Sequence, residues 1–123
     1  MSKTSQEYVN FIVELLSPIR TIRSGRFFGG IGLSTDGIQF AMLMGNSLYF
    51  VVDGVTRPRY EEMGSQCFWY TTKKGRVDVK KYYGVPAELL EDPARLVALA
   101  EESIQAAGRA GRGGKVPKRV PKA

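Results

Sequence analysis

The strongest pattern along the chain is a run of three apolar segments that begins near Arg26 and ends near Asp53. Two short polar dipeptides, Asp36-Gly37 and Gly45-Asn46, separate these segments. Asp, Asn and Gly tolerate the positive φ angles of tight hairpin turns, so the pattern predicts a three-stranded antiparallel meander. We expect its strands over residues 26–33, 38–44 and 48–52.

Helical signals precede and follow this meander. Residues 4–7, Thr-Ser-Gln-Glu, have the spacing of a capping box that begins at the threonine, and the apolar residues behind it recur at helical intervals. This pattern predicts a helix over residues 5–16. After the meander, Thr56 is followed by Arg-Pro. A threonine cap with proline in the first turn is typical of a helix start, so this pattern predicts a short helix over residues 57–63.

Two further strands and a last helix complete the pattern. Strands are predicted over residues 66–72 and 77–82, with a turn at Lys74-Gly75. Asp92-Pro93 then opens a helix whose apolar stripe is expected to end at Gly108, a residue type that commonly ends helices. The order is α-β-β-β-α-β-β-α, with the strands in consecutive hairpins. It predicts an α+β domain in which helices pack on an antiparallel sheet.

Size and composition indicate one domain, residues 1–107, followed by a tail, residues 108–123. A chain of 123 residues is long enough to bury a core without disulfides. One Cys excludes an internal disulfide, and the absence of His leaves too few soft ligands for a zinc site, so we expect no metal or cofactor. We find no signal-peptide pattern and no run long enough to cross a bilayer, so we expect a cytoplasmic protein.

The net charge of +6 comes entirely from the tail. Residues 1–107 carry twelve Lys or Arg and twelve Asp or Glu, whereas residues 108–123 carry six cations and no acid. The tail is rich in Gly and Pro and lacks aromatic residues, so we expect it to be disordered. It resembles the flexible arms that lie along DNA, and a merely solubilising tail is the competing explanation. The candidate nucleic-acid contacts are Arg109, Arg112, Lys115, Lys118, Arg119 and Lys122.

A second group of cations surrounds the predicted turn between the last two strands. Such a patch could contact phosphates. Asp78 lies among these cations, however, and charged hairpin ends are ordinarily only solvated, which is the explanation we favour. The basic patch consists of Lys73, Lys74, Arg76, Lys80 and Lys81.

Three consecutive aromatic residues, Phe68, Trp69 and Tyr70, lie in the first strand of the same hairpin. Alternation along a strand sends Trp69 to the face opposite its two neighbours. If those neighbours face the helices, Trp69 faces outward or into an interface, and tryptophan is enriched at protein contacts. Burial of Trp69 beneath a helix or a loop is the alternative.

The remaining glycine-rich or reactive residues are better explained by structure than by chemistry. Residues 29–32, Gly-Gly-Ile-Gly, lack the third glycine and the helix of a dinucleotide-binding loop, so we expect a bulge or close helix packing on a strand. Cys67 has no His to act as a base and no second Cys, which favours a structural thiol. Glu61 and Glu62 are adjacent on a helix and so point to different sides. Core and sheet positions are expected for Tyr49, Tyr82 and Tyr83.

Short motifs also follow one another in a specific order. They are Arg26-Phe27-Phe28-Gly29-Gly30, Asp36-Gly37, Leu48-Tyr49-Phe50, Tyr82-Tyr83 with Val85-Pro86, and Leu90-Glu91-Asp92-Pro93. In this order and spacing the chain resembles the TfoX N-terminal domain family over roughly residues 8–107. The resemblance implies the same α-β-β-β-α-β-β-α fold, with a likeness to the small chaperones of type III secretion. It also implies bacterial transcriptional co-regulation that depends on a partner regulator, with no enzymatic residues.

We therefore expect a non-enzymatic regulatory domain that acts through a protein partner, with the basic tail contacting nucleic acid. A homodimer is compatible with this expectation, and a membrane role is not expected. The alternative is a chaperone-like or structural module that binds a peptide along the sheet, suggested by the antiparallel fold and Trp69. An enzyme has the least support, because no catalytic constellation is found.

Overall fold

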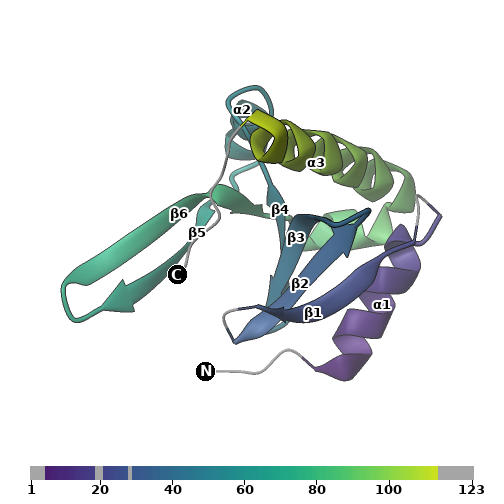
Figure 1. The fold of residues 1–123 in the computed structure, drawn as a ribbon, viewed down its shortest axis with the longest axis horizontal. Helices are drawn as coiled ribbons and strands as arrows, with labels where there is room; N and C mark the ends of the chain where they lie inside the picture. The colour runs from purple at the N-terminus through teal and green to yellow at the C-terminus, as the bar shows by residue number, and fades with distance from the viewer. Residues whose placement is uncertain (1–4, 19–20, 28, 114–123) are drawn as a thin grey trace.

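A computed structural model describes the chain over residues 5–18, 21–27 and 29–113. Within these ranges one antiparallel sheet is combined with three α-helices and a short 3-10 helix (Figure 1), so the predicted α+β class is confirmed. The strand order in the sheet is β1-β2-β3-β4-β6-β5. The elements are α1 (Gln6–Leu16), β1 (Arg23–Phe27), β2 (Gly30–Thr35), β3 (Ile38–Met44), β4 (Ser47–Val51), α2 (Arg57–Glu62), β5 (Cys67–Thr72), β6 (Gly75–Gly84), η1 (Ala87–Glu91) and α3 (Pro93–Gly113).

The predicted order of elements is confirmed, with one strand added. The segment expected to be a single strand over residues 26–33 contains the end of β1 and the beginning of β2, which pair with each other. Gly29, with a φ of 80°, lies between them. The sequence-based prediction lacks this hairpin because Gly29-Gly30, a pair that also suits a tight turn, is assigned there to a bulge or to close helix packing. The predicted meander is therefore four-stranded, with β1 at its edge.

The two predicted turns are confirmed, and their backbone angles explain their sequences. Asp36 and Gly37 both have positive φ, 54° and 77°, as in a type I′ turn between β2 and β3. In the next turn Gly45 has a φ of 60°, while Asn46 is not among the residues with positive φ, as in a type II′ turn between β3 and β4. Both turn types match the twist of an antiparallel hairpin.

The first helix begins one residue later than the capping box suggests. Ser5, not Thr4, caps α1, because the backbone N–H of Tyr8 donates to Ser5 Oγ at 3.1 Å. The cap of the last helix is as predicted, with the Arg95 N–H directed at Asp92 Oδ1 at 3.4 Å.

The last helix does not end at Gly108, so that prediction is wrong. Helix α3 continues to Gly113, and the first residues of the segment expected to be a disordered tail are therefore helical. Gly108 is buried close to Ile38 of β3, with which an added Cβ would be in ordinary contact at 3.7 Å. Packing against the sheet thus outweighs the low helix propensity of glycine. Residues 114–123 lie outside the described residues.

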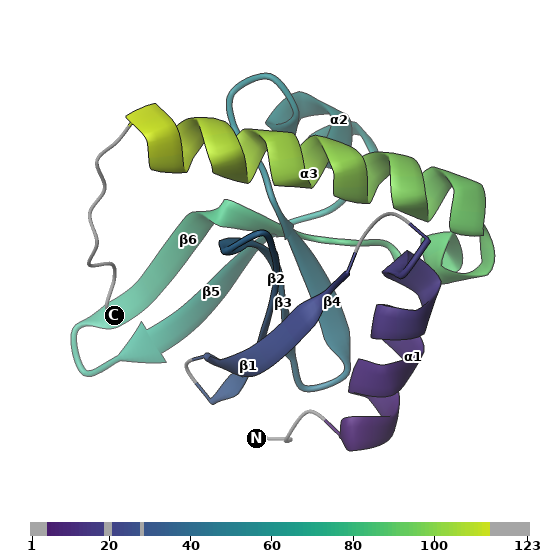
Figure 2. The same ribbon diagram turned by 45° about the vertical axis from the view of Figure 1, so that its right-hand side comes forward.

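The main core lies between the sheet and the long helix α3, which runs across β3 and β4 with α1 against one end (Figure 2). Strands β2 and β3 change register between Leu33 and Ser34, so Phe40 is an extra residue on β3. Its carbonyl oxygen accepts a 2.6 Å hydrogen bond from Ser103 Oγ of α3, and Ser103 is buried. Fully buried apolar residues of this core include Ile12, Leu16, Leu33, Phe40, Leu43, Phe50 and Leu96.

The opposite face of the sheet is strongly curved. The ring of Phe27 on β1 lies 6.2 Å from that of Tyr82 on β6, measured between centroids, although β2, β3 and β4 separate these strands. Inside the curve, Gln39 Nε2 donates to Tyr82 Oη at 3.0 Å. Met42 and Val51, whose cross-strand pairs place them on this face, are almost completely buried. We call this surface the concave face.

Glycines on β2 make the curvature possible. A Cβ added at Gly30 would overlap the Leu43 carbonyl oxygen, and one added at Gly32 would lie 2.5 Å from Gln39 Oε1. The expectation that a helix packs closely on the Gly-Gly-Ile-Gly segment is wrong, because the groups nearest to Gly30 and Gly32 belong to β3. The missing side chains leave room for the groups that line the concave face.

Strand β6 takes part in two separate pairings. Its inner residues 82–84 pair with β4, and its outer residues 75–79 pair with β5. The register shifts between the Cys67–Tyr83 and Phe68–Val79 pairs, so residues 80–82 have no paired residue on β5. Beyond this point β5 and the outer part of β6 project from the body (Figure 1). We call this projecting part, residues 68–79 with the adjoining Lys80 and Lys81, the hairpin.

Candidate functional site

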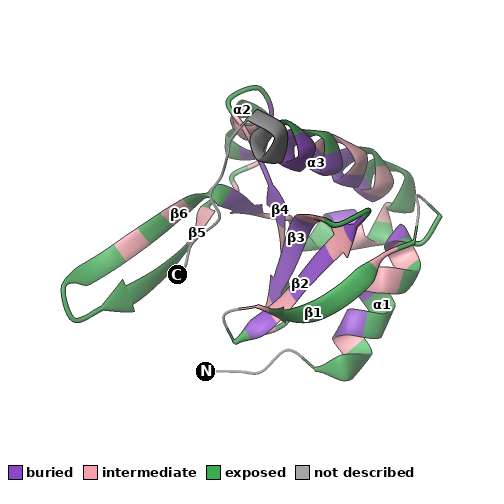
Figure 3. Cartoon of the chain, viewed as in Figure 1, coloured by how far each residue is buried: buried purple, intermediate pink, exposed green. Residues whose placement is uncertain are grey.

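The hairpin carries the basic patch predicted from the sequence, and its residues are largely exposed (Figure 3). All five cations are on the surface, and they are accompanied by one acid, Asp78. Outside the hairpin, residues 1–107 hold seven cations and eleven acids. Within residues 1–107 the hairpin therefore carries a net positive charge, and the remaining residues carry a net negative charge.

Asp78 neutralises only one member of the patch. Arg76 Nε lies 2.7 Å from Asp78 Oδ1, and both side chains are exposed. Among the described residues, none of the four lysines takes part in an ion pair that the structure shows. Lys81 Nζ lies 5.9 Å from the centroid of the Tyr82 ring.

Trp69 lies at the surface of the hairpin, with 43% of its area exposed. It is paired with Asp78 across the hairpin, and the Arg76 guanidinium carbon lies 4.3 Å from its ring centroid. This cation–π contact holds the tryptophan against the strand pair without burying it. Of the two alternatives left by the sequence, outward placement is observed.

Phe68 and Tyr70 do not face the helices. Their rings lie on the other side of the hairpin from Trp69, and Phe68 contacts Tyr49 edge-on at 5.3 Å between centroids. Tyr49 is paired with Met42 and thus belongs to the concave face. The aromatic residues of β5 therefore extend the concave face outward, a relation between distant residues that no local sequence signal indicates.

The start of the predicted basic tail is tied to the domain. Arg109 Nη2 forms an ion pair with Asp53 Oδ2, and the other carboxylate oxygen accepts hydrogen bonds from the N–H groups of Val55 and Thr56, both at 3.0 Å. The hydrogen bond from Arg109 lowers the pKa of Asp53 to about 2, and the two backbone hydrogen bonds act in the same direction. Arg109 is therefore already paired. The side chains of Arg112, Lys115, Lys118, Arg119 and Lys122 lie outside the described residues.

The Asp53–Arg109 pair should make stability depend on acid pH. Because the pKa of Asp53 is lower in the folded chain than the ordinary 3.8, its contribution is complete above about pH 4 and is lost as the pH falls towards 2. Asp53→Asn should lower the free energy of unfolding by about 1 kcal/mol or less at pH 7, since the pair is partly exposed. Urea unfolding at pH 7 and pH 2.5 measures this difference, which should shrink at the lower pH. Glu62→Gln, on an exposed side chain, is the control; a difference that persists at pH 2.5 would contradict the ion-pair explanation.

The remaining residues singled out from the sequence have structural surroundings. Tyr83 Oη donates to Glu61 Oε2 at 2.8 Å, and both Glu61 and Glu62 are exposed. Burial, followed by the acceptor Glu61, raises the pKa of Tyr83. Cys67 is a half-buried free thiol. Tyr82 and Tyr83 are buried and Tyr49 is half-buried, in agreement with the predicted core and sheet positions.

One buried polar atom was not anticipated. Arg57 Nε at the start of α2 is buried and has no hydrogen-bond partner among the described residues. Its charge acts on Tyr83, whose pKa it tends to lower against the larger effect of burial. The sequence marks Arg57 only as a first-turn helix residue, so this environment could not be inferred from it.

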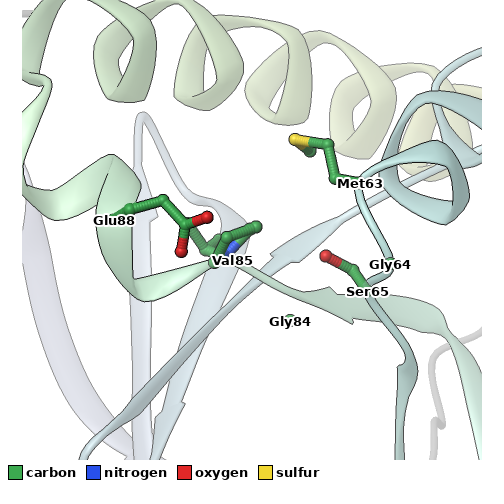
Figure 4. A pocket seen from close by; sticks show the side chains of 7 residues that line it. Met63, Gly64, Ser65, Gly84, Val85 and Glu88 are labelled. Atoms are coloured by element: carbon green, nitrogen blue, oxygen red, sulfur yellow. The ribbon is translucent and has the colours of Figure 1, made fainter.

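A small open pocket of about 280 Å³ lies where the segment after α2 meets the end of β6 (Figure 4). Glu88 is the only titratable side chain among the residues that line it, and Figure 4 shows its carboxylate and the Ser65 hydroxyl as separate polar groups. This volume lies just below the usual range for ligand pockets, about 300–1,000 Å³. The lining residues are Met63, Gly64, Ser65, Gly84, Val85, Pro86 and Glu88.

Within residues 5–18, 21–27 and 29–113, no group of three or more His, Cys, Asp or Glu residues could hold a metal ion. In the same part of the chain, no helix combines the length and the apolar character that crossing a membrane requires.

Comparison with known proteins identifies similarities over most of the chain. Residues 14–107 match the family model described as the TfoX N-terminal domain. The chain is also 27% identical over 110 residues to a protein of Aliivibrio fischeri named DNA transformation protein TfoX1. The aligned part covers 85% of this chain and 48% of that protein, so the chain spans about half the length of this relative. The resemblance predicted from the motifs is confirmed.

Proposed function

Because the chain belongs to the TfoX N-terminal domain family, we propose that it is a regulatory interaction domain in bacterial competence-related gene control. In this proposal it acts through a protein partner and contacts nucleic acid through its basic tail. The observation that carries the proposal is the family match, together with the printed name of the Aliivibrio fischeri relative, a DNA transformation protein.

The charge distribution supports a nucleic-acid contact by the tail. Helix α3 carries the chain to Gly113, and four cations follow this helix with no acid between them: Lys115, Lys118, Arg119 and Lys122. Since Asp53 already pairs with Arg109, the cations beyond Gly113 are the ones we assign to phosphates. Each phosphate contact contributes about −0.9 to the slope of log affinity against log salt concentration for duplex DNA.

Neutralising these four cations should weaken duplex binding and flatten its salt dependence. We expect the chain with K115Q, K118Q, R119Q and K122Q to lose about 3 to 4 from the magnitude of that slope, because about four contacts disappear. Fluorescence anisotropy with a labelled duplex at several salt concentrations measures both quantities. A chain ending at Gly113 should behave like the four-Gln variant and keeps the whole of α3.

The control for net charge is R23Q/R26Q, which removes two exposed cations from β1 and none from the tail or the hairpin. Equal salt slopes for the full chain and the four-Gln variant would show that the tail does not contact phosphates. The partner is tested separately, by cross-linking the full chain in a bacterial lysate and identifying the captured protein. Failure to capture a regulator of transcription would contradict that part of the proposal.

The second candidate is a module that binds a peptide along the sheet. It is favoured by β5, an edge strand with the sequence Cys-Phe-Trp-Tyr-Thr-Thr and therefore without charge. Edge strands normally carry charges that prevent pairing with other chains, so an uncharged one can accept an added strand. Competition by short strand-forming peptides for the cross-linked partner distinguishes this candidate from the regulatory one.

A further inference from the structure

We propose that the hairpin is a binding site for single-stranded nucleic acid, in which bases stack on aromatic side chains of β5 and lysines contact the phosphates. This site is separate from the tail, and the inference does not depend on the proposed function. It concerns a second surface, built from residues that the fold brings together.

The first observation is a row of aromatic rings along the hairpin. The Tyr49 and Phe68 centroids are 5.3 Å apart, and the Phe68 and Tyr70 centroids are 6.2 Å apart. Exposure increases outward along this row, from half-buried Tyr49 and Phe68 to Tyr70, of which 40% is exposed. A row of partly exposed rings is the element on which single-stranded binding proteins stack successive bases.

The second observation is the surface that supports the row. The residues paired with Phe68 and Tyr70 across the hairpin are Val79 and Val77, which therefore lie on the same face. Both valines are half-buried and uncharged. The rings of Phe68 and Tyr70 thus stand on an apolar strand pair, with Phe68 half-buried and Tyr70 exposed.

The third observation is the distribution of charge around the rings. Lys73 and Lys74 form the turn at the tip, and Lys80 and Lys81 lie at the base of the hairpin. Cations therefore stand at both ends of the aromatic row, as expected for a backbone that passes along it. The excess of acids in the rest of residues 1–107 would steer a polyanion towards the hairpin.

These observations favour a single strand over other occupants. The bases of a duplex are already stacked on one another, so exposed aromatic rings gain little from it, whereas unpaired bases offer free faces. A second copy of the chain would bring an equally positive hairpin against this one, which is unfavourable. An acidic protein would satisfy the lysines but leaves the ordered row of rings unexplained.

Because Trp69 lies on the side of the hairpin opposite to the Phe68–Tyr70 row, binding is followed on the ligand and not on the tryptophan. We expect fluorescently labelled oligo(dT) to gain anisotropy when the full chain is added, and the titration to give the affinity. Tyr70→Ala should weaken binding by about 5- to 150-fold, the range measured for the loss of one stacking aromatic residue. Tyr70→Phe, which keeps the ring, should bind like the natural chain.

The cations are tested by K73Q/K74Q. Loss of two phosphate contacts should reduce the salt slope by about 1.4, at about 0.7 per contact for single strands. Phe11→Ala is the matched control, because Phe11 is an equally exposed aromatic residue, at 45%, on α1. It should leave oligo(dT) binding unchanged. Circular dichroism of each variant verifies that the fold is retained.

Three results would overturn the inference. The first is equal oligo(dT) affinity for Tyr70→Ala, Phe11→Ala and the natural chain. The second is loss of all oligo(dT) binding in the four-Gln tail variant while hairpin variants bind normally, which would leave the proposed role of the tail intact. The third is tighter binding of the duplex than of the single strand with no effect of Tyr70→Ala.

Discussion

Gly30→Ala is expected to lower the free energy of unfolding by about 3 kcal/mol, the upper part of the range for overpacking a closed site. A Cβ at this position overlaps the Leu43 carbonyl oxygen and would lie 2.6 Å from Met44 Sδ. The sulfur belongs to a flexible side chain and can move, but the carbonyl is part of the β3 backbone. Relief of the overlap therefore requires β2 and β3 to shift relative to each other.

Gly25→Ala provides a matched control on the neighbouring strand. Gly25 is opposite Gly32 in the β1–β2 pair, and an added Cβ would have no atom within 4 Å. The substitution should be neutral or stabilise the chain by up to about 1 kcal/mol, because it restricts the unfolded chain without strain in the folded one. Urea unfolding followed by circular dichroism compares the two variants. Equal stability of both would mean that the concave face is more open than described.

Tyr60→Ala is expected to cost about 3–5 kcal/mol, the range for removing a buried aromatic side chain. Tyr60 is only 1% exposed and is the largest of the fully buried side chains. Its ring lies 6.3 Å from that of Tyr83, measured between centroids, and so joins the short helix α2 to β6. A helix of six residues has little stability of its own, so α2 depends on this contact.

Tyr60→Phe separates the contribution of the ring from that of the hydroxyl. It retains the packing volume, so we expect a change of about 1 kcal/mol or less, as for other volume-conserving replacements. Thermal unfolding of both variants measures the contrast. If Tyr60→Phe were as destabilising as Tyr60→Ala, the hydroxyl and not the buried ring would be responsible.

Local signals were sufficient for much of the fold. Asp36-Gly37 and Gly45-Asn46 identified two hairpins because their backbone angles are intrinsic to those residue types. Asp92-Pro93 identified the start of α3 for the same reason. The turn before β2 contains Gly29-Gly30, which suits a turn and a bulge equally well, and the strand β1 was therefore merged with its neighbour.

Long-range contacts account for what the sequence did not predict. Gly108 has a weak helix propensity, but contact with β3 carries α3 past it. Arg109 and Asp53 are 56 residues apart, and nothing near either residue indicates that they meet. The charges of the candidate site could be counted from the sequence, whereas the alignment of Tyr49 with the β5 rings depends on how β4, β6 and β5 are arranged in the sheet.

The double pairing of β6 has a consequence for how such a domain can diversify. Tyr82 and Tyr83 belong to the half of the strand that pairs with β4 and are buried, while the half that pairs with β5 contributes little to the core. Residues 80–82 have no paired residue on β5. Insertions, deletions or charge changes in the outer part of the hairpin therefore need not disturb the packing of the body. Natural variation can therefore remodel the projecting half for new ligands while the scaffold stays the same.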